Sequence, residues 1–290
     1  MTAGYAVAEL EDALVPPSDP GAAGFFDVDN TMMRGASIYY FARGLAARKY
    51  FTTGDLVRFG LQQLRFRVLA NEHGGDMTQA KETALAFVAG RPAEDIRHLS
   101  EEIFDEFMAS RIWSGTHALA RLHLDAGQRV WLVTAAPVDL GAVIARRLGL
   151  TGAIGTVAEI EDGVYTGRLV GDLMHGPAKA AAILDLAERE GLDLSQCSAY
   201  SDSVNDLPML AAVGRAVAVN PDSALRRVAR ERGWEIRDFR TGRKAAKIAV
   251  PAAVGAGAVA GAVAATIALN RRGIFRSAHR SGARRIRRLI

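Results

Sequence analysis

Two carboxylates stand two residues apart, directly after an apolar stretch. Asp27 and Asp29 follow Phe25 and Phe26, with Val28 between them. In an extended segment, residues i and i+2 point to the same side, so both acids address one point in space. Carboxylates aimed at one point repel each other unless a cation or a shared proton lies there. The pair suits a metal-assisted reaction in which one carboxylate attacks and the other moves a proton.

A calcium loop is the main alternative for this segment, and the sequence disfavours it. Such a loop needs a glycine at its centre for a sharp turn and a bidentate Glu at its end. Met32 and Ile38 occupy those positions here. Because isolated acids at strand ends are often turn or cap residues, the chemical interpretation depends on partners further along the chain.

Two later segments offer groups that would contact a phosphoryl oxygen. Thr134 ends an apolar run, and the small residues after it leave backbone amides accessible; a local capping function for Thr134 is the alternative. Lys179 stands at the expected start of a helix, where its charge opposes the helix dipole. Either an anionic partner holds Lys179 there, or it is a solvated surface lysine.

A dense acidic cluster follows another short apolar run. Asp202 and Asp206 are four residues apart, with Asn205 between them. Asp202 is placed to reach a metal from the end of a strand, and Asp206 follows one helical turn later. Capping explains one of these acids but not the whole cluster.

The elements that must position these residues are those of an α/β protein. Between residue 24 and about residue 240, short apolar runs alternate with helical patterns. The segment 163–169 is expected to be a hairpin or a pair of turns. The expected strands are Ala23–Asp27, Arg129–Thr134, Ala153–Val157, Cys197–Ser201 and Ala216–Val219, and the expected helices include Val138–Leu148 and Ala178–Glu190.

Residues 36–112 differ from the rest because they contain long stretches of helix formers and no convincing strand. The segment is too long to be a loop and lies between the first two strands. Ligands of open α/β sheets bind at the carboxyl ends of the strands, so we expect a helical cap that selects substrates and excludes water. Its expected helices are Ile38–Lys49, Asp55–Glu72, Thr78–Ala89 and Ala93–Arg111.

In this order and spacing, the acidic, hydroxyl and lysine residues resemble the four motifs of the haloacid dehalogenase-like hydrolases. Within that superfamily the chain is similar to the phosphoserine-phosphatase-like branch, subfamily IB. The resemblance implies a Rossmann-like parallel sheet formed by residues 21–35 and 113–240, with the cap 36–112 inserted after the first strand. The motif residues are Asp27, Asp29, Thr31, Thr134, Lys179, Asp202 and Asp206.

The resemblance also implies a reaction, the hydrolysis of a phosphomonoester through an aspartyl-phosphate. Asp27 would be the nucleophile, and Asp29 would protonate the leaving oxygen and later activate water. Mg²⁺ would be bound by the Asp27 carboxylate, the Asp29 main-chain carbonyl and Asp202, with waters completing the octahedron.

The remaining motif residues would act on the phosphoryl group. Thr134 and Lys179 would stabilise its charge, with the Ala135 amide beside them, and Asn205 would help to hold the phosphate. Asp206 would orient Lys179 or metal-bound water. Most of the catalytic effect in phosphoryl transfer is positioning and electrostatics.

One departure from the family pattern concerns the substrate. Phosphoserine phosphatases carry an acid early in the cap that pairs with the substrate amine, whereas Met33–Ser37 contains no acid and includes Arg34. An acidic or partly apolar phosphomonoester, including a lipid-derived one, is therefore favoured over phosphoserine or another small soluble phosphate. The non-enzymatic alternative is a catalytically silent regulatory protein tethered to a membrane.

Composition bounds the remaining possibilities. The chain has 290 residues and a net charge of +4, but residues 241–290 contain eleven Lys or Arg and no acid, so the first 240 residues carry −7. A nucleic-acid-binding surface on the catalytic body is therefore not supported. The single cysteine, Cys197, fits a reducing compartment. Residues 1–20 have neither a basic start nor an apolar core and are expected to form a disordered leader without a signal peptide.

The C-terminal fifth suggests a membrane. Residues 248–269 are uncharged, long enough to span a bilayer but rich in Ala and Gly, and the tail 270–290 carries eight arginines. We expect a membrane-associated helix with a basic tail on anionic headgroups and a cytoplasmic catalytic domain; a low-complexity tail that packs loosely or contacts nucleic acid is the alternative. A shallow helix that keeps both basic flanks on one face avoids sending the arginines across the membrane.

Overall fold

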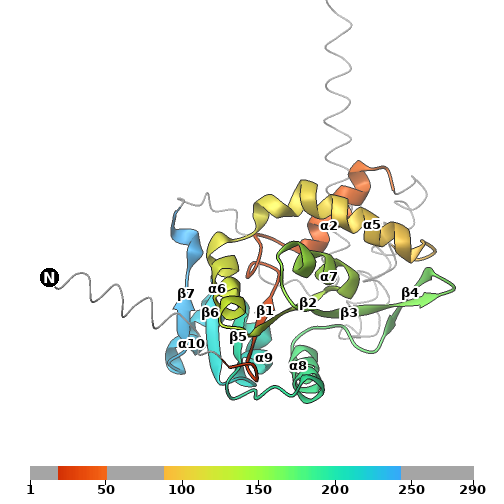
Figure 1. The fold of residues 1–290 in the computed structure, drawn as a ribbon. Helices are drawn as coiled ribbons and strands as arrows, with labels where there is room; N and C mark the ends of the chain where they lie inside the picture. The colour runs from red at the N-terminus through yellow and green to blue at the C-terminus, as the bar shows by residue number, and fades with distance from the viewer. Residues whose placement is uncertain (1–18, 51–87, 243–290) are drawn as a thin grey trace, which may run out of the picture.

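The computed structural model describes residues 19–50 and 88–242, and in this part of the chain a single seven-stranded sheet forms the centre (Figure 1). The strand order is β4-β3-β2-β1-β5-β6-β7. Neighbouring strands are parallel except for β4, which pairs antiparallel with β3. The strands are β1 Ala23–Asp27, β2 Arg129–Pro137, β3 Gly152–Glu161, β4 Val164–Val170, β5 Ser198–Ser201, β6 Arg215–Val219 and β7 Glu235–Arg237. The prediction of an α/β fold with a mostly parallel sheet is confirmed.

Helices cover both faces of the sheet. Residues from α2, α5, α6 and α7 form one buried cluster with one face of the strands, and residues from α8, α9 and α10 form the other. Each cluster is a continuous apolar layer, as expected for a sheet buried on both faces. The helices are α2 Ser37–Ala47, α5 Ala93–Ile103, α6 Ser114–Asp125, α7 Val138–Arg147, α8 Pro177–Glu190, α9 Leu207–Ala211 and α10 Ser223–Glu231.

The two phenylalanines before the first acid show how the central strand is fixed. Phe25 and Phe26 are fully buried and belong to opposite clusters, because successive side chains of a strand point to opposite faces. Phe26 stacks on Tyr200 of β5, with ring centroids 4.0 Å apart and planes 6° from parallel. This anchoring brings Asp27 to the carboxyl edge of the sheet.

Several predicted boundaries differ from the structure. β2 was expected to end at Thr134, but it continues to Pro137, with an irregular register against β3 between Val133 and Pro137. The expected helix Ala93–Arg111 is interrupted after Ile103 by a π-helical turn and then a 3₁₀ turn. The segment predicted as a hairpin is one, since its second strand is β4.

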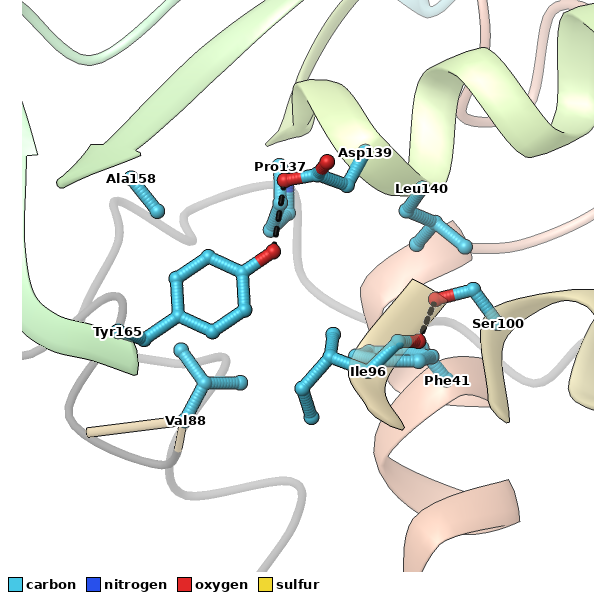
Figure 2. A pocket seen from close by; sticks show the side chains of 9 residues that line it. All are labelled: Phe41, Val88, Ile96, Ser100, Pro137, Asp139, Leu140, Ala158 and Tyr165. Atoms are coloured by element: carbon cyan, nitrogen blue, oxygen red, sulfur yellow. Dashed lines mark hydrogen bonds between the residues drawn. The ribbon is translucent and has the colours of Figure 1, made fainter. Parts of the chain in front are cut away.

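Residues from both ends of the predicted cap pack against the core around a small apolar pocket, called the joint below (Figure 2). Across it, the Tyr165 hydroxyl donates a 2.7 Å hydrogen bond to Asp139, which also pairs with Arg97 of α5. The lining is too apolar to hold a phosphate, so this joint is a contact between elements and not the predicted site. The residues around it are Phe41, Val88, Ile96, Ser100, Pro137, Asp139, Leu140, Ala158 and Tyr165.

Several predictions concern residues outside the described part of the chain. These are the leader, the cap helix Asp55–Glu72, nearly all of Thr78–Ala89, the apolar segment 248–269 and the basic tail 270–290. Within residues 19–50 and 88–242, no helix is both long enough and apolar enough to cross a membrane.

Candidate active site

Asp27 lies at the carboxyl end of the central strand. Its side chain is buried, and its Cα pairs in register with that of Val133 on β2. The Lys179 ammonium donates a 2.6 Å hydrogen bond to Asp27 Oδ1. This contact joins residues that are 152 positions apart, so the sheet and α8 together create it.

Lys179 is held by two carboxylates. It is the third residue of α8, after Pro177 at the first position, and is only 3% exposed. Its ammonium also donates to Asp206 Oδ2 at 2.8 Å, and the Ser201 hydroxyl donates to the same oxygen at 2.8 Å. A solvated surface lysine is therefore excluded, and the anionic partners expected for this position are Asp27 and Asp206.

The charge state of this cluster follows from its burial. Burial raises the pKa of Asp27 to about 7, although Lys179 acts in the opposite direction. Burial and the neighbouring Asp27 carboxylate raise the pKa of Asp202 to about 8. Burial alone would lower the pKa of Lys179, but Asp27 and Asp206 raise it above its ordinary value. The lysine is thus firmly charged, whereas the carboxylates lack compensating positive charge.

Asp29 lies on the other side of the same turn. Its Oδ1 accepts a 2.8 Å hydrogen bond from the Ser37 N–H, at the first residue of α2. Burial raises the pKa of Asp29, and the Ser37 hydroxyl and main-chain N–H both act in the opposite direction. The chain turns sharply after Asp29 because Asn30 adopts a left-handed conformation with φ of 60°, which asparagine tolerates better than most residues.

Asp202 follows β5 and is fixed through its neighbours. The Thr31 hydroxyl donates a long, 3.4 Å hydrogen bond to Asp202 Oδ1. The Asp222 N–H donates to the Asp202 carbonyl at 2.8 Å, and Asp222 Oδ2 accepts from the Val204 N–H at 3.1 Å. Asp222 thus binds the main chain at both Asp202 and Val204 and fixes the segment that carries Asp202.

Thr134, Ala135 and Asn205 make their hydrogen bonds elsewhere. Thr134 is buried, its Oγ1 accepts from the Ala136 N–H at 3.1 Å, and its hydroxyl proton is free to donate elsewhere. The Ala135 carbonyl accepts from the Thr156 hydroxyl at 2.8 Å, which fixes that peptide. Asn205 is exposed. Within the described residues, no hydrogen bond or ion pair joins these three to Asp27 or Lys179.

The oxygen donors fit a hard divalent cation. Asp27, Asp29, Asp202 and Asp206 act on one another electrostatically, and of these four acids Lys179 contacts only Asp27 and Asp206, so these five groups together carry excess negative charge when the carboxylates are ionised. In the described part of the chain, no three His, Cys, Asp or Glu side chains converge tightly enough to enclose an ion by themselves. Mg²⁺ does not require that, because it is usually held by one or two carboxylates and keeps several waters.

Three residues of this arrangement were not predicted from the sequence. Ser201 precedes Asp202 and donates to Asp206, and a polar residue at the end of a buried strand is a usable signal for such a contact. Asp222 also caps α10 by accepting from the Leu225 N–H at 2.7 Å, a position that the Asp before a helical pattern indicates. The Ser37 contact is made by main chain and leaves no signal in residue types.

Comparison with known proteins agrees with this geometry. The sequence model of the haloacid dehalogenase-like hydrolases matches residues 25–211. A protein from Mycobacterium leprae is 59% identical over 237 residues, covering 82% of this chain and 79% of that protein. Phosphoserine phosphatase SerB1 of Mycobacterium tuberculosis is 58% identical over 237 residues, covering 82% of this chain and 77% of that protein.

A solved structure has a similar fold. A protein of unknown function from Bordetella pertussis Tohama I superposes with a TM-score of 0.65 at 29% identity, covering 75% of this chain and 99% of that one. The matched segment 25–211 spans all four predicted motifs, including the ion-paired Asp27, Lys179 and Asp206. The chain therefore belongs to the haloacid dehalogenase-like hydrolases and is a phosphoric monoester hydrolase of their phosphoserine-phosphatase-like branch.

Proposed function

We propose that the chain is a Mg²⁺-dependent phosphomonoesterase that forms an aspartyl-phosphate on Asp27. The observation that carries the proposal is the buried Lys179 ammonium, 2.6 Å from Asp27 and 2.8 Å from Asp206. A structural ion pair at this depth costs desolvation that a hydrophobic pair would avoid. Its location at the carboxyl edge of the sheet, beside Asp29 and Asp202, supports a catalytic purpose.

The proposed roles follow from what each group contacts. Asp27 Oδ2, the oxygen not bonded to Lys179, attacks phosphorus, and the leaving alkoxide takes a proton from Asp29. Lys179 moves no proton but stabilises negative charge on the transferring group. Asp29 then takes a proton from water, which attacks the aspartyl-phosphate and releases inorganic phosphate. Thr134 donates its free hydroxyl proton to a phosphoryl oxygen, with the Ala135 amide beside it.

Mg²⁺ would be held by the Asp27 carboxylate, the Asp29 main-chain carbonyl and Asp202, where it would neutralise charge on the phosphoryl oxygens. The raised pKa values of Asp27 and Asp202 support this, since both carboxylates gain when a cation replaces the missing positive charge. Asp206 keeps Lys179 in place, and Asn205, which is exposed beside Asp206, is positioned to meet the phosphate from the solvent side.

Two substrate classes deserve direct comparison. Similarity to phosphoserine phosphatase SerB1 over most of the chain favours O-phosphoserine. The absence of an acid in the segment 33–37, together with the apolar and basic residues after 248, favours a lipid-derived phosphate. Arg34 in that segment donates to the Ser110 carbonyl at 2.6 Å and stacks on Trp113, so its charge is already engaged at the base of the predicted cap.

The test is hydrolysis of p-nitrophenyl phosphate by the full chain with Mg²⁺, and again after EDTA. Asp27→Asn is expected to lose activity by at least about a thousand-fold. Asp185→Asn, which changes an exposed acid on α8 that pairs with Arg189, should retain it. A wild type without activity between about pH 5 and 8 would favour the regulatory protein. Equal activity in Asp27→Asn would contradict the nucleophile, and EDTA without effect would contradict the metal.

The same preparation then decides the substrate class. Initial rates on O-phosphoserine and on a lysophospholipid phosphate are compared at equal concentration. A kcat/KM at least about ten-fold higher for one of them assigns the class, since ten-fold corresponds to about 1.4 kcal/mol of differential transition-state binding. A preference for O-phosphoserine would contradict the lipid interpretation.

A further inference from the structure

The acid that is proposed to move protons is also the cap of a helix. Helix α2 begins at Ser37, and its N-terminal flanking residue, Ala36, supplies no side-chain hydrogen bond. The Ser37 N–H donates instead to Asp29 Oδ1, eight residues earlier in the chain, at 2.8 Å. A free N–H at a helix start is normally satisfied by a nearby Ser, Thr, Asp or Asn side chain. Here the Asp29 carboxylate accepts this hydrogen bond in place of a neighbouring side chain.

The loop between the two residues is built to bring them together. Asn30 is left-handed, its N–H donates to the Gly35 carbonyl at 3.3 Å, and its Oδ1 accepts from the Gly35 N–H at 3.0 Å. These two hydrogen bonds between Asn30 and Gly35 close the loop, and Asp29 and Ser37 meet at its base. Ser37 is fully buried, so solvent does not compete for its N–H.

The Ser37 side chain acts on the same carboxylate as the Ser37 N–H. Its hydroxyl lies close enough to lower the pKa of Asp29, but it is buried and its geometry falls short of a hydrogen bond to any described residue. The main-chain N–H therefore makes the hydrogen bond, and the hydroxyl is a second donor near the same carboxylate.

We infer that Ser37 is a positioning residue for proton transfer, because its N–H fixes Asp29 Oδ1 and leaves Oδ2 as the oxygen that carries the proton. This inference rests on the acid–base role proposed for Asp29. When the phosphoester P–O bond breaks, the proton leaves Asp29 Oδ2 for the departing alkoxide oxygen. The carboxylate formed keeps its bond from Ser37 and then takes a proton from the attacking water. Helix α2, the first helix of the predicted cap, thereby sets the orientation of the acid.

Proline at position 37 removes this contact with little change to the helix. Proline is favoured at the first position of a helix because its fixed φ is already helical and its missing N–H is not needed there. Ala36, with φ of −89° and ψ of 126°, has the extended conformation that a residue before proline requires. Ser37→Ala retains the N–H and removes only the hydroxyl. Ser114→Pro is the matched control, since Ser114 is the exposed first residue of α6, which also follows an extended residue.

The readout is a series of leaving groups. kcat/KM is measured for phenyl, p-nitrophenyl and dinitrophenyl phosphate, whose leaving groups need a proton to decreasing degrees. We expect Ser37→Pro to lose at least about ten-fold on phenyl phosphate and less than about three-fold on dinitrophenyl phosphate. Ser114→Pro should change all three substrates by less than about three-fold, and Ser37→Ala, which keeps the N–H, should lose less on phenyl phosphate than Ser37→Pro does. A uniform loss in Ser37→Pro would indicate a merely structural role and overturn the inference.

Asp29→Ala separates failure of this inference from failure of the proposed function. If Asp29→Ala also shows no selective loss on phenyl phosphate, the acid–base role itself is wrong. A selective loss in Asp29→Ala but not in Ser37→Pro overturns only the positioning by Ser37.

A second measurement does not depend on whether Ser37→Pro folds. Amide hydrogen exchange of Ser37 is expected to be at least about ten-fold faster in Asp29→Ala than in the wild type, because the N–H loses its acceptor. The exchange rate of Ser114 should not change. An unaltered rate at Ser37 would show that Asp29 does not hold this amide and would overturn the inference.

Discussion

At the scale of single residues, the decisive feature is an ammonium buried between two carboxylates. Replacing Lys179 with Met leaves Asp27 and Asp206 buried without their counter-charge. We expect activity to fall by at least about a thousand-fold and the free energy of unfolding near pH 8 to fall by about 3–5 kcal/mol. Phosphatase assays and urea unfolding measure the two effects.

A second substitution separates these effects. Lys179→Met with Asp206→Asn removes one uncompensated charge, so part of the stability should return while activity stays lost. Arg189→Met, on the exposed side of the same helix, should leave both nearly unchanged. If Lys179→Met unfolds at the same urea concentration as the wild type, the buried ion pairs do not contribute as described.

The raised carboxylate pKa values make a pH prediction. Asp27 and Asp202 titrate at about 7 and about 8 in the folded protein and near 3.8 when unfolded, so folding favours their neutral forms. Their contribution to stability is complete below the unfolded value and is lost as pH rises through about 7 to 8.

Without metal, the midpoint of thermal unfolding should therefore fall as pH rises through this window, and the fall should be smaller in Asp202→Asn. Added Mg²⁺ should stabilise the protein more above the window than below it, because binding needs the ionised carboxylates. Thermal melts in EDTA and in Mg²⁺ across this range measure both effects. A midpoint that rises with pH in EDTA, equally in wild type and variant, would contradict the assignment.

At the scale of elements, Asp222 links the start of α10 to the segment that carries Asp202. It accepts from the Leu225 and Val204 amides and donates its own N–H to the Asp202 carbonyl. Asp222→Ala should cost about 1–2 kcal/mol through the lost cap and also raise the Mg²⁺ concentration needed for half-maximal activity. Asp193→Ala is the matched control, since Asp193 accepts two similar bonds from Ser195 in an exposed turn. An unchanged Mg²⁺ requirement in Asp222→Ala would leave Asp222 with only its helix-capping role.

The elements also show how far the sequence could predict the structure. Apolar runs ending in polar residues located β1, β5 and β6 closely, and Gly191 ends α8 in the left-handed conformation expected of a C-terminal glycine. An anionic partner for Lys179 was one of the two alternatives that its unfavourable place at a helix start left open, and the ion pairs decide between them. Patterns of this kind are local, so they carry over to the structure.

What the sequence could not predict depends on tertiary pairing or on main chain. The extension of β2 to Pro137 is set by its irregular pairing with β3, and the three-residue strand β7 is defined by its partner β6. The π-helical turn at Phe104–Met108 lies within an uninterrupted helical pattern. The bond from Ser37 to Asp29 involves a backbone amide, which every residue except proline carries.

At the scale of the whole molecule, the last described residues end beside the catalytic edge. Asn220 donates to the Asn30 carbonyl at 3.4 Å and accepts from the Phe239 N–H at 2.7 Å. Phe239 also lies against Gly115, where a Cβ would come within 2.3 Å of its ring. The segment before residue 243 is therefore attached, through Asn220, to the turn that follows Asp29.

The association of the C-terminus with a membrane, expected from the sequence, can be tested directly. Residues 241–290 carry eleven Lys or Arg and no acid, and each basic residue near an anionic surface contributes about 1 kcal/mol. The full chain should sediment with phosphatidylserine-containing vesicles at low salt, whereas a chain ending at residue 242 should remain in the supernatant. A variant in which the eight arginines after residue 270 are changed to Gln keeps the apolar segment 248–269. Its sedimentation separates the contribution of the arginine charges to vesicle binding from that of the apolar segment.

Activity gives the matching readout. Removal of residues 243–290 should change p-nitrophenyl phosphate hydrolysis by less than about two-fold, but lower the rate on a lysophospholipid phosphate embedded in anionic vesicles by at least about ten-fold, because the local substrate concentration is lost. High salt should produce the same loss in the full chain, since screening weakens attraction to the surface. A full chain that ignores anionic vesicles at low salt would contradict the membrane proposal and leave a soluble phosphomonoester as the substrate.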